Sequence, residues 1–514
     1  MSVVRSGQSL VLPDDEHNRA LVSHAHPDDW VNPTPAGRYN LVVLGAGTAG
    51  LVSAIGAASL GARVAIVERH LTGGDCLNFG CVPSKALISA ARAAAVARGA
   101  GRFGIRTAPD PQVDFAAVME RMRRLRAGLA WNDSVGRLAG LGVDVYLGAA
   151  RFIRDDAVEV DGRTLQFSRA VIATGARPAV PAIPGLGDAG FHTNETIFSV
   201  TERPRHLLVI GAGPIGCELA QTFGRFGSDV TIIGRSARLL PREDPDASAI
   251  VERTLVREGV TVVANARILQ VERRDTSLSR VVVYEYDGQQ REVAGDEILI
   301  AVGRAPNVEG LDVAAAGIAS DAAGVTVDDS LRTTNRRVYA AGDICSRHKF
   351  THAADAMARV VLHNALFFGR KKASALVVPW ATYTDPEVAH VGLSAKDAQR
   401  LGDTVTTLTV PLSEVDRAVL EDETEGFARV QVDRRRGTIL GATMVASHAG
   451  ELIGEIAVAM RAGVGMGAIG FTIHPYPTQS EAWKRLGDEW NRTRLTPGGA
   501  HAAPVAAAVA AVTR

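Results

Sequence analysis

Residues 39–68 read YNLVVLGAGTAGLVSAIGAASLGARVAIVE, a succession of strand, glycine turn, helix and strand. The turn carries the fingerprint G-x-G-x-x-G at Gly45, Gly47 and Gly50. In such a βαβ unit the first glycine permits a tight turn, the second lets a pyrophosphate approach the backbone, and the third lets the helix pack on the strand. The pyrophosphate then meets the helix N-terminus, where unpaired N–H groups favour negative charge. Residues 39–68 therefore predict a Rossmann-like dinucleotide site.

The same pattern returns at residues 206–233, where HLLVI leads into GAGPIG with its glycines at Gly211, Gly213 and Gly216. Either motif alone is a weak signal, because a glycine-rich turn also occurs without a ligand. Two copies with matching strand and helix flanks predict two dinucleotide-binding domains in one chain.

The position 23 residues after the first glycine distinguishes the two sites. In the first unit it is Glu68, whose carboxylate suits the hydroxyls of an adenosine ribose. In the second unit it is Gly234, which Arg235 and Arg238 follow, and a guanidinium suits a 2′-phosphate. A solvated basic turn is the other interpretation of these arginines. The contrast predicts FAD at the first site and NADPH, rather than NADH, at the second.

A cysteine pair follows the first unit, in GGDCLNFGCVPSKAL at residues 73–87. Cys76 and Cys81 precede a helix expected to begin near Pro83, and a helix N-terminus stabilises a thiolate. A zinc site would need four ligands, and the chain has no second close pair among its four cysteines. A redox pair is therefore favoured over two inert buried cysteines. The two isolated cysteines, expected to be structural, are Cys217 and Cys345.

The motif G-G-x-C-x4-C-x-P-S-K after a dinucleotide fingerprint resembles that of the FAD-dependent pyridine nucleotide–disulfide reductases. That family includes glutathione reductase, dihydrolipoamide dehydrogenase and mercuric reductase. The resemblance covers roughly residues 39–490, with further landmarks in ATGARP (173–178), AVGRAPN (301–307) and AAGDI (340–344). It implies an α/β fold with two Rossmann-like domains, for FAD and NADPH, and an α+β C-terminal dimerisation domain. It also implies a homodimer.

The domain boundaries follow from these landmarks and from composition. Residues before the first strand are rich in Pro, Asp and His without periodicity, and the end of the chain is an alanine-rich run with no polar face. The predicted parts are an N-terminal extended arm (1–38), an FAD-binding domain (39–200 and 305–375), an NAD(P)H-binding domain (201–304), a dimerisation domain (376–495) and an Ala-rich tail (496–514).

The resemblance also assigns roles to single residues. Cys81 would be the cysteine nearest the flavin, and Cys76 the thiol that meets the acceptor. Lys85 would lie beside flavin N5 and pair with Glu218. A cation there agrees with flavin chemistry, because it stabilises the anionic reduced form. The remaining implied cofactor residues are Glu68, Thr174, Gly175 and Asp343 for FAD, and Gly303 for NADPH.

The C-terminal segment IHPYPTQSEAW (473–483) departs from the disulfide-reducing members. Those members carry H-P-T-x-x-E, in which the glutamate orients a histidine base that reaches across the dimer. Here Glu481 is retained and Tyr476 stands at the position of the base, as it does in mercuric reductases. A phenol with a pKa near 10 is a poor base at neutral pH, although it can hydrogen-bond a metal–thiolate. His474 is the alternative base or metal ligand.

These features predict an enzyme that passes electrons from NADPH through FAD and the Cys76–Cys81 disulfide to an acceptor. The leading acceptor is a thiophilic metal ion such as Hg(II), held transiently by the two sulfurs, since thiolates select soft ions. No cysteine follows Cys345, so the C-terminal cysteine pair of mercuric reductases is missing, which counts against a full assignment. One alternative is a reductase of lipoamide or of a low-molecular-weight disulfide. Another is a redox-sensing flavoprotein without significant turnover.

Composition sets outer limits on these hypotheses. The 514 residues include 56 Lys and Arg against 56 Asp and Glu, so there is no general attraction to nucleic acid or anionic membranes. Four cysteines are too few for a disulfide-stapled secreted protein, and the N-terminus lacks the apolar core of a signal peptide. The uncharged run 39–62 is long enough to cross a bilayer, but its glycine turn favours the βαβ unit. We expect a cytoplasmic protein with no nucleic-acid or membrane partner.

Overall fold

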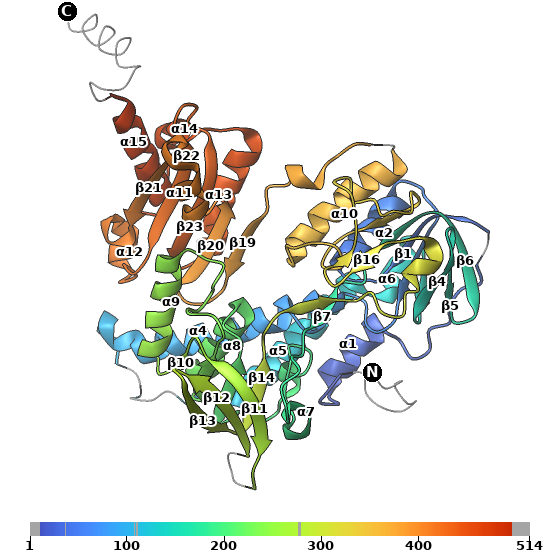
Figure 1. The fold of residues 1–514 in the computed structure, drawn as a ribbon, viewed down its shortest axis with the longest axis horizontal. Coiled ribbons are helices and arrows are strands. Elements are labelled where there is room, and N and C mark those ends of the chain that lie inside the picture. Colours follow the sequence, from blue (N-terminus) through green and yellow to red (C-terminus); the bar gives the residue numbers. More distant parts are fainter. Residues whose placement is uncertain are drawn as a thin grey trace, which may run out of the picture. The chain divides into compact units, whose positions relative to one another are not determined.

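The computed structural model describes residues 11–495 apart from 36, 107, 109–111, 276–278 and 368. The predicted Ala-rich tail, 496–514, lies outside the described residues. The chain divides into two compact units (Figure 1). One unit contains Met1–Arg235 and Ala266–Leu376, and the other contains Ser236–Asn265 and Val377–Arg514.

The first unit is built on the sheet that carries the first fingerprint. Its parallel strands are β1 (Tyr39–Leu44), β2 (Val64–Glu68), β3 (Val143–Leu147), β6 (Arg163–Ile172) and β18 (Val338–Ala340). Strands β4 (Ala150–Arg154) and β5 (Ala157–Val160) extend β6 antiparallel. Leu41 and Val43 pack into one apolar cluster, with helices α2 (Thr48–Ser59) and α10 (Thr351–Leu366). Val42 and Leu44 pack into another. Both faces are covered, which explains why β1 is apolar from Leu41 to Leu44.

The second fingerprint repeats this arrangement. Its elements are β8 (His206–Ile210), α8 (Pro214–Arg225), β9 (Asp229–Ile233) and β14 (Glu297–Ile300), with β9 and β14 both parallel to β8. At φ +101°, a Cβ on Gly45 would lie 2.4 Å from Ala173 O; at φ +126°, one on Gly211 would lie 2.3 Å from Ala301 O. Both first glycines are therefore required by the same close approach of a neighbouring strand end.

Other elements of the first unit connect and flank these sheets. The remaining helices of at least five residues are α1 (Glu16–Ala25), α3 (Gly74–Asn78), α4 (Cys81–Gly99), α5 (Phe115–Ala130) and α6 (Val135–Gly140). Strands β7 (Ala176–Pro178) and β15 (Arg304–Pro306) pair, as do β11 (Arg267–Arg273), β12 (Arg280–Tyr286) and β13 (Gln289–Gly295).

The prediction of an extended arm over residues 1–38 is wrong for part of its length, because Glu16–Ala25 form helix α1. The side chain of Asp15 caps this helix by accepting a hydrogen bond from the Asn18 N–H. Leu21 and Ala25, one helical turn apart, are completely buried. So short and polar a helix depends on tertiary packing rather than on its own periodicity, which is why the sequence pattern did not reveal it.

The second unit is an α+β module, as predicted. Its antiparallel sheet has the order β19 (Pro379–Thr382), β20 (Glu387–Gly392), β23 (Ile439–Ala446), β22 (Phe427–Asp433) and β21 (Val405–Pro411). Its longer helices are α9 (Pro245–Arg257), α13 (Ala449–Ala462) and α15 (Glu481–Leu495), with the shorter α11 (Ala395–Leu401), α12 (Asp416–Leu420) and α14 (Met466–Phe471). Trp483 and Trp490 of α15 lie in the apolar core over this sheet.

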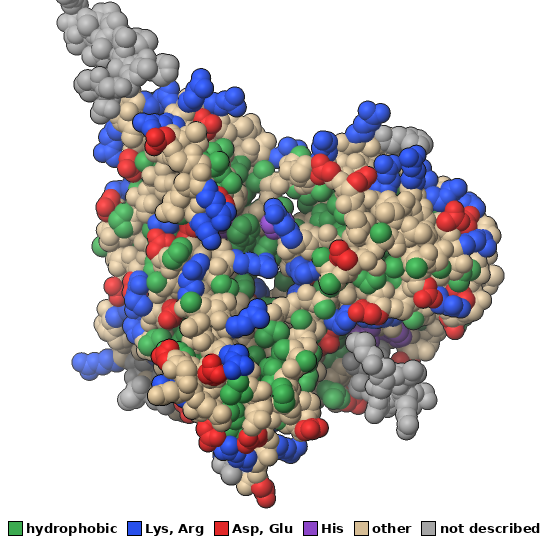
Figure 2. Space-filling model, viewed as in Figure 1, with side chains coloured by type: hydrophobic (Ala, Val, Ile, Leu, Met, Phe, Trp, Pro, Cys, Tyr) green, Lys and Arg blue, Asp and Glu red, His purple; other side chains and the backbone are tan. Residues whose placement is uncertain are grey.

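Charged side chains of both signs are interspersed over the visible face of each unit, in agreement with the equal numbers of acidic and basic residues (Figure 2). Within the part of the chain that the structure describes, no helix is both long enough and apolar enough to cross a bilayer. The run 39–62 instead forms strand β1 and helix α2.

Candidate active site

The two candidate redox cysteines lie at a helix junction in the first unit. Cys76 belongs to α3, and Cys81 is the first residue of α4, two positions earlier than predicted. Both are thiols, hydrogen-bonded to each other, and Thr351 Oγ1 lies 3.5 Å from Cys81 Sγ. The hydrogen bond from Cys76 lowers the pKa of Cys81 to about 6, with further lowering by Thr351 and by the charge of Lys85. The same bond raises the pKa of Cys76, so Cys81 carries the thiolate of the reduced pair.

A partly buried ion pair joins the redox helix to the helix of the second fingerprint. Lys85, one turn after Cys81 on α4, donates to Glu218 Oε2 at 2.8 Å, and only 7% of the Glu218 side chain is exposed. The pairing that the resemblance implied is therefore present. Because a buried carboxylate needs a charged partner, the pair holds the ammonium group at a fixed place near the thiols. The position of Lys85 beside a flavin stays a prediction.

Glu68 lies where the first fingerprint would receive an adenosine ribose. Its Oε2 accepts the Ala46 N–H at 2.7 Å and its Oε1 accepts the His70 N–H at 2.8 Å. These bonds orient the carboxylate, and each oxygen retains a lone pair for a ribose hydroxyl. Burial raises the pKa of Glu68. A Cβ on Gly50 would lie 1.8 Å from Gly45 O, so the helix meets the strand as closely as the fingerprint requires.

The other residues predicted for FAD lie on loops of the same unit. Arg304 pairs with the carboxylate of Asp343 at 3.4 Å and with that of Asp75, the neighbour of Cys76, at 3.3 Å. Burial raises the pKa of Asp343. Thr174 Oγ1 donates to the Asn307 carbonyl at 2.9 Å, and Asn307 N–H donates to the Gly175 carbonyl at 3.0 Å. This set of carboxylates, backbone groups and turns fits FAD.

Arg304 and Thr351 are the site residues that sequence reasoning missed. Arg304 stands inside the landmark AVGRAPN, so the motif itself was the available signal. Thr351 begins α10, and no local pattern connects it with a cysteine 270 residues away.

In the second fingerprint the middle glycine is open and the third is crowded. A Cβ on Gly213 would meet nothing within 4 Å, whereas one on Gly216 would lie 2.2 Å from Gly211 O. Gly234 has no room for an acid like Glu68, because its Cβ would lie 2.7 Å from the Cβ of Ala212. Arg235 follows it and is exposed. The turn at Gly303 has a φ of +138°.

Arg238 belongs to the second unit and makes contacts within its own turn. Its Nη2 donates to the carbonyls of Pro241 and Glu243, both at 3.2 Å. Recruitment to a phosphate would require Arg238 to give up these bonds. Its predicted role in NADPH binding stays a prediction.

The C-terminal segment gives Tyr476 and His474 different surroundings within the second unit. Tyr476 is 72% exposed, and its hydroxyl donates to Asp416 Oδ2 at 2.9 Å, a bond that raises the pKa of the phenol. The His474 ring lies 2.9 Å from Glu455 Oε1 through Nε2 and 3.0 Å from the Thr472 carbonyl through Nδ1. Glu481 pairs with Arg485 at 3.3 Å. Tyr476 is accessible, and His474 has both ring nitrogens engaged.

The two isolated cysteines differ in burial. Cys217 is completely buried in α8, and Cys345 is half-buried, with burial raising its pKa to about 12. Among the described residues, no group of three or more His, Cys, Asp or Glu side chains is arranged to hold a metal ion. Transient binding of a substrate metal ion by Cys76 and Cys81 stays a prediction.

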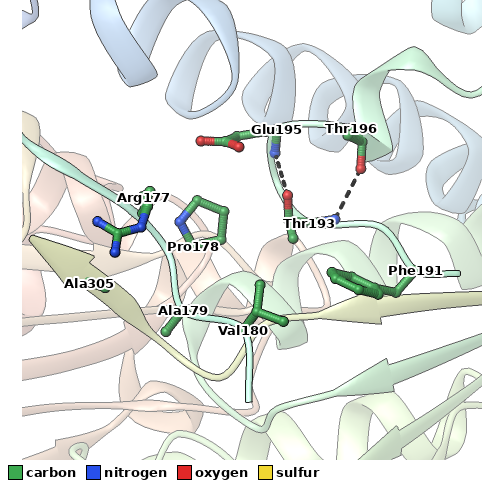
Figure 3. A pocket seen from close by; sticks show the side chains of 9 residues that line it. All are labelled: Arg177, Pro178, Ala179, Val180, Phe191, Thr193, Glu195, Thr196 and Ala305. Carbon is green, nitrogen blue, oxygen red and sulfur yellow. Dashed lines mark hydrogen bonds between the residues drawn. The ribbon is translucent and has the colours of Figure 1, made fainter. Parts of the chain in front are cut away.

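A separate cavity of about 540 Å³ lies beside the strand β7 (Figure 3). Burial raises the pKa of Glu195 on its wall, and Arg177 forms a two-point ion pair with Glu309 at 2.8 Å. The lining residues, none of them predicted as site residues, are Arg177, Pro178, Ala179, Val180, Phe191, Thr193, Glu195, Thr196 and Ala305.

The family of the chain follows from two matches. Residues 39–358 match the model of the pyridine nucleotide-disulphide oxidoreductases, and residues 378–486 match the dimerisation domain of the same family. The chain belongs to this family. It is therefore an NAD(P)H-dependent flavoprotein disulfide oxidoreductase, and its dimerisation domain supports a homodimer.

Individual relatives carry different activities. A mercuric reductase of Bacillus cereus is 35% identical over 92% of this chain and 74% of its own length. A dihydrolipoyl dehydrogenase of Thermus scotoductus is 34% identical over 86% of this chain and 95% of its own. The Cu(II) complex of RclA, an HOCl-induced flavoprotein disulfide reductase of Escherichia coli, has a TM-score of 0.78 at 28% identity, covering 88% of this chain and 100% of RclA. This family requires FAD and a pyridine nucleotide, and the acceptor differs among its members.

Proposed function

We propose that the enzyme passes two electrons from NADPH, through FAD and the Cys76–Cys81 pair, to a thiophilic metal ion, with Hg(II) as the leading substrate. The observation that carries this proposal is the environment of Tyr476. An exposed phenol with a raised pKa stands where disulfide-reducing relatives carry a histidine base, and His474 is engaged by Glu455 and the Thr472 carbonyl. A metal ion needs two thiolates and no base to protonate a leaving thiol, so a tyrosine in place of the histidine is compatible with this acceptor.

Glu68, Thr174, Gly175 and Asp343 would hold FAD, which would supply the two-electron connection between NADPH and the disulfide. Reduction leaves Cys81 as the thiolate, which Cys76, Thr351 and Lys85 stabilise. Cys76 loses its proton when it binds the metal ion, because coordination strongly favours the thiolate. The two thiolates then give two electrons to Hg(II), the S–S bond forms again, and Hg(0) leaves. The net reaction consumes NADPH and Hg(II) and yields NADP⁺, one proton and Hg(0).

The charges around Tyr476 agree with a cationic acceptor. Asp416 accepts the bond from the phenol, and Gln479 Nε2 lies 3.3 Å from Glu421 and 3.2 Å from Glu423. These three carboxylates would repel an anionic disulfide substrate, whereas their charge is compatible with a metal cation. The names of two relatives point the same way, a mercuric reductase and a flavoprotein disulfide reductase captured with Cu(II).

The second candidate is a disulfide reductase, which the similarity to dihydrolipoyl dehydrogenases favours. It would need His474 to leave Glu455, or a water molecule, to act as the base. A redox-sensing flavoprotein is a third candidate. It would bind both nucleotides and show no acceptor-dependent rate above the slow reaction with oxygen.

The test is NADPH oxidation by the purified FAD-loaded enzyme with Hg(II) supplied as a dithiol complex, while elemental mercury vapour is trapped. We expect one mole of Hg(0) for each mole of NADPH, and no vapour from Cys76→Ala. Inhibition by Hg(II) without vapour, together with turnover of lipoamide or of a small disulfide, would assign the enzyme to the second candidate. Full acceptor activity in Cys81→Ser would disprove the role of the cysteine pair.

A further inference from the structure

The N-terminal segment 11–35 lies outside the residues that match the family, which begin at residue 39, yet it packs on the redox segment. Leu21 and Ala25 of α1 share one apolar cluster with Leu71 and Leu77. Leu77 stands between the two cysteines, immediately after Cys76. The apolar face of α1 is therefore completed by the redox segment itself.

A buried arginine makes the polar part of this contact. Arg126 of α5 is 1% exposed, and its Nη1 donates to the Asn78 carbonyl, again between the cysteines, at 2.8 Å. Its Nη2 donates to Asn18 Oδ1 of α1 at 2.6 Å, and Asn18 is also 1% exposed. Burial lowers the pKa of Arg126 to about 10. A buried guanidinium needs its acceptors, so Asn18 determines how firmly Arg126 holds the Asn78 carbonyl.

The end of α1 makes a second set of bonds to the same segment. The Ala25 carbonyl accepts the Thr72 N–H at 3.1 Å and the Thr72 hydroxyl at 3.2 Å. His26 Nδ1 bonds to the His70 carbonyl. Further along, Asn32 exchanges two hydrogen bonds with the backbone of Leu147, at 2.9 Å and 2.7 Å, which fixes the segment on the edge strand β3.

We infer that residues 11–35 are a clasp that fixes the spacing of Cys76 and Cys81, with Asn18 as its positioning residue. The inference rests on the proposed function, in which this pair is the redox centre. Two points of the segment between His70 and Asn78 are held by α1 and its flank, at His70 and Thr72, and the third, the Asn78 carbonyl, is held by Arg126 of α5, which Asn18 of α1 contacts. A disulfide and a thiol–thiolate hydrogen bond both tolerate little change in sulfur separation, so a looser clasp changes the reactivity of both sulfurs.

The test uses the full-length, FAD-loaded enzyme and measures the pH dependence of iodoacetamide alkylation of each cysteine in the reduced protein, by mass spectrometry. Asn18→Ala removes the acceptor of Arg126. We expect it to move the alkylation midpoint of Cys81 upward by at least half a pH unit. Asn18→Asp retains an oxygen for Arg126 and should restore the wild-type midpoint. Arg19→Ala is the matched control, because Arg19 lies on the exposed face of α1 and pairs with Asp14.

Leu21→Ala provides a second variant if Asn18→Ala folds poorly. It weakens the apolar packing of α1 on the redox segment and leaves Arg126 its hydrogen bond to Asn18. Midpoints equal to wild type in both Asn18→Ala and Leu21→Ala, with the helix still protected from hydrogen exchange, would overturn the clasp. The readout needs no acceptor, so it separates this inference from the proposed function. Full turnover by the Cys81→Ser variant would refute the proposed function. The alkylation shift of Asn18→Ala would still support the clasp.

Discussion

At the scale of single residues, the chemistry depends on which sulfur holds the charge. The Cys81 thiolate receives hydrogen bonds from Cys76 and Thr351 and lies near the Lys85 ammonium, while Cys76 keeps its proton. This difference in protonation predicts different roles for the two sulfurs. Cys81 is poised as the sulfur that already carries charge, and Cys76 is the sulfur that ionises when the acceptor binds.

Replacement of Thr351 by valine removes one donor to Cys81 and keeps the side-chain volume. A hydrogen bond to a charged group contributes about 1.5–3 kcal/mol, so we expect the pKa of Cys81 to rise by roughly one to two units from its value of about 6. The pH dependence of alkylation in the reduced enzyme measures this shift. Thr351→Ser keeps the hydroxyl and should leave the pKa unchanged; an equal rise in both variants would mean that packing at this position, rather than the hydroxyl, determines the pKa of Cys81.

Tyr476 is predicted to serve the acceptor and not the reduction of the inner disulfide. Tyr476→Phe removes the hydroxyl that donates to Asp416. We expect roughly a tenfold loss of metal-dependent turnover, with little change in reduction of the disulfide by NADPH. Stopped-flow measurement of the two half-reactions separates them. Equal losses in both would indicate a structural tyrosine.

At the scale of elements, the stretch 236–265 is the least expected part of the fold. It falls within the predicted NAD(P)H-binding domain over 201–304, a boundary that stays a prediction, and by compactness it groups with the C-terminal sheet. Glu243 accepts the Trp380 indole N–H at 2.8 Å, and Asp244 pairs with Arg429 at 3.3 Å. Both carboxylates are buried, so this attachment includes ionisable groups without access to water.

Glu243 makes the stability of this attachment depend on pH. Burial raises its pKa to about 7, above its ordinary value, so the folded protein binds a proton more readily than the unfolded chain. The free energy of unfolding should therefore fall as pH rises from about 4.5 to about 7, by on the order of 3 kcal/mol for this group. Glu243→Gln should remove that part of the decrease. Urea unfolding at pH 5 and pH 8 measures the difference, with Glu414→Gln, at an exposed position, as the control.

At the scale of the whole molecule, two nearly identical turns are predicted to bind different nucleotides. The backbone contacts at Gly45 and Gly211 differ by 0.1 Å, so the turns alone offer no discrimination. We expect the choice of nucleotide to depend on the residues at the end of the second strand of each βαβ unit. There the first copy has a buried, oriented Glu68, and the second has Gly234 against Ala212 and then an exposed Arg235.

Arg235→Ala should therefore reduce kcat/KM for NADPH by about 10- to 100-fold, as expected for a lost charge-assisted bond to a phosphate, and change kcat/KM for NADH less than about twofold. Steady-state rates with both nucleotides at low ionic strength measure this. Arg238→Ala is the comparison and should have the smaller effect, because Arg238 bonds to the carbonyls of Pro241 and Glu243. An unchanged preference in Arg235→Ala would refute the assignment of the 2′-phosphate site.

The sequence by itself determined the fold class, the family, the paired fingerprints and the cysteine pair. Each of these is a local pattern, in which the residues that make one turn or one helix end lie within a few positions of each other. The Lys85–Glu218 pair was also foreseen, because both residues stand inside recognisable motifs. Tyr476 was identified in the same way, from its place in a short C-terminal segment.

Only the tertiary structure decided which distant residues surround these motifs. Thr351 reaches Cys81 across 270 residues, and Asn18 reaches Arg126 across 108, with no periodicity or spacing that connects them. The helix over 16–25 belongs with them, because its stability depends on the redox segment and α5 against which it packs. Local patterns encode how the backbone turns, whereas contacts between separate elements depend on packing of the whole chain, and that packing holds the two sulfurs in place.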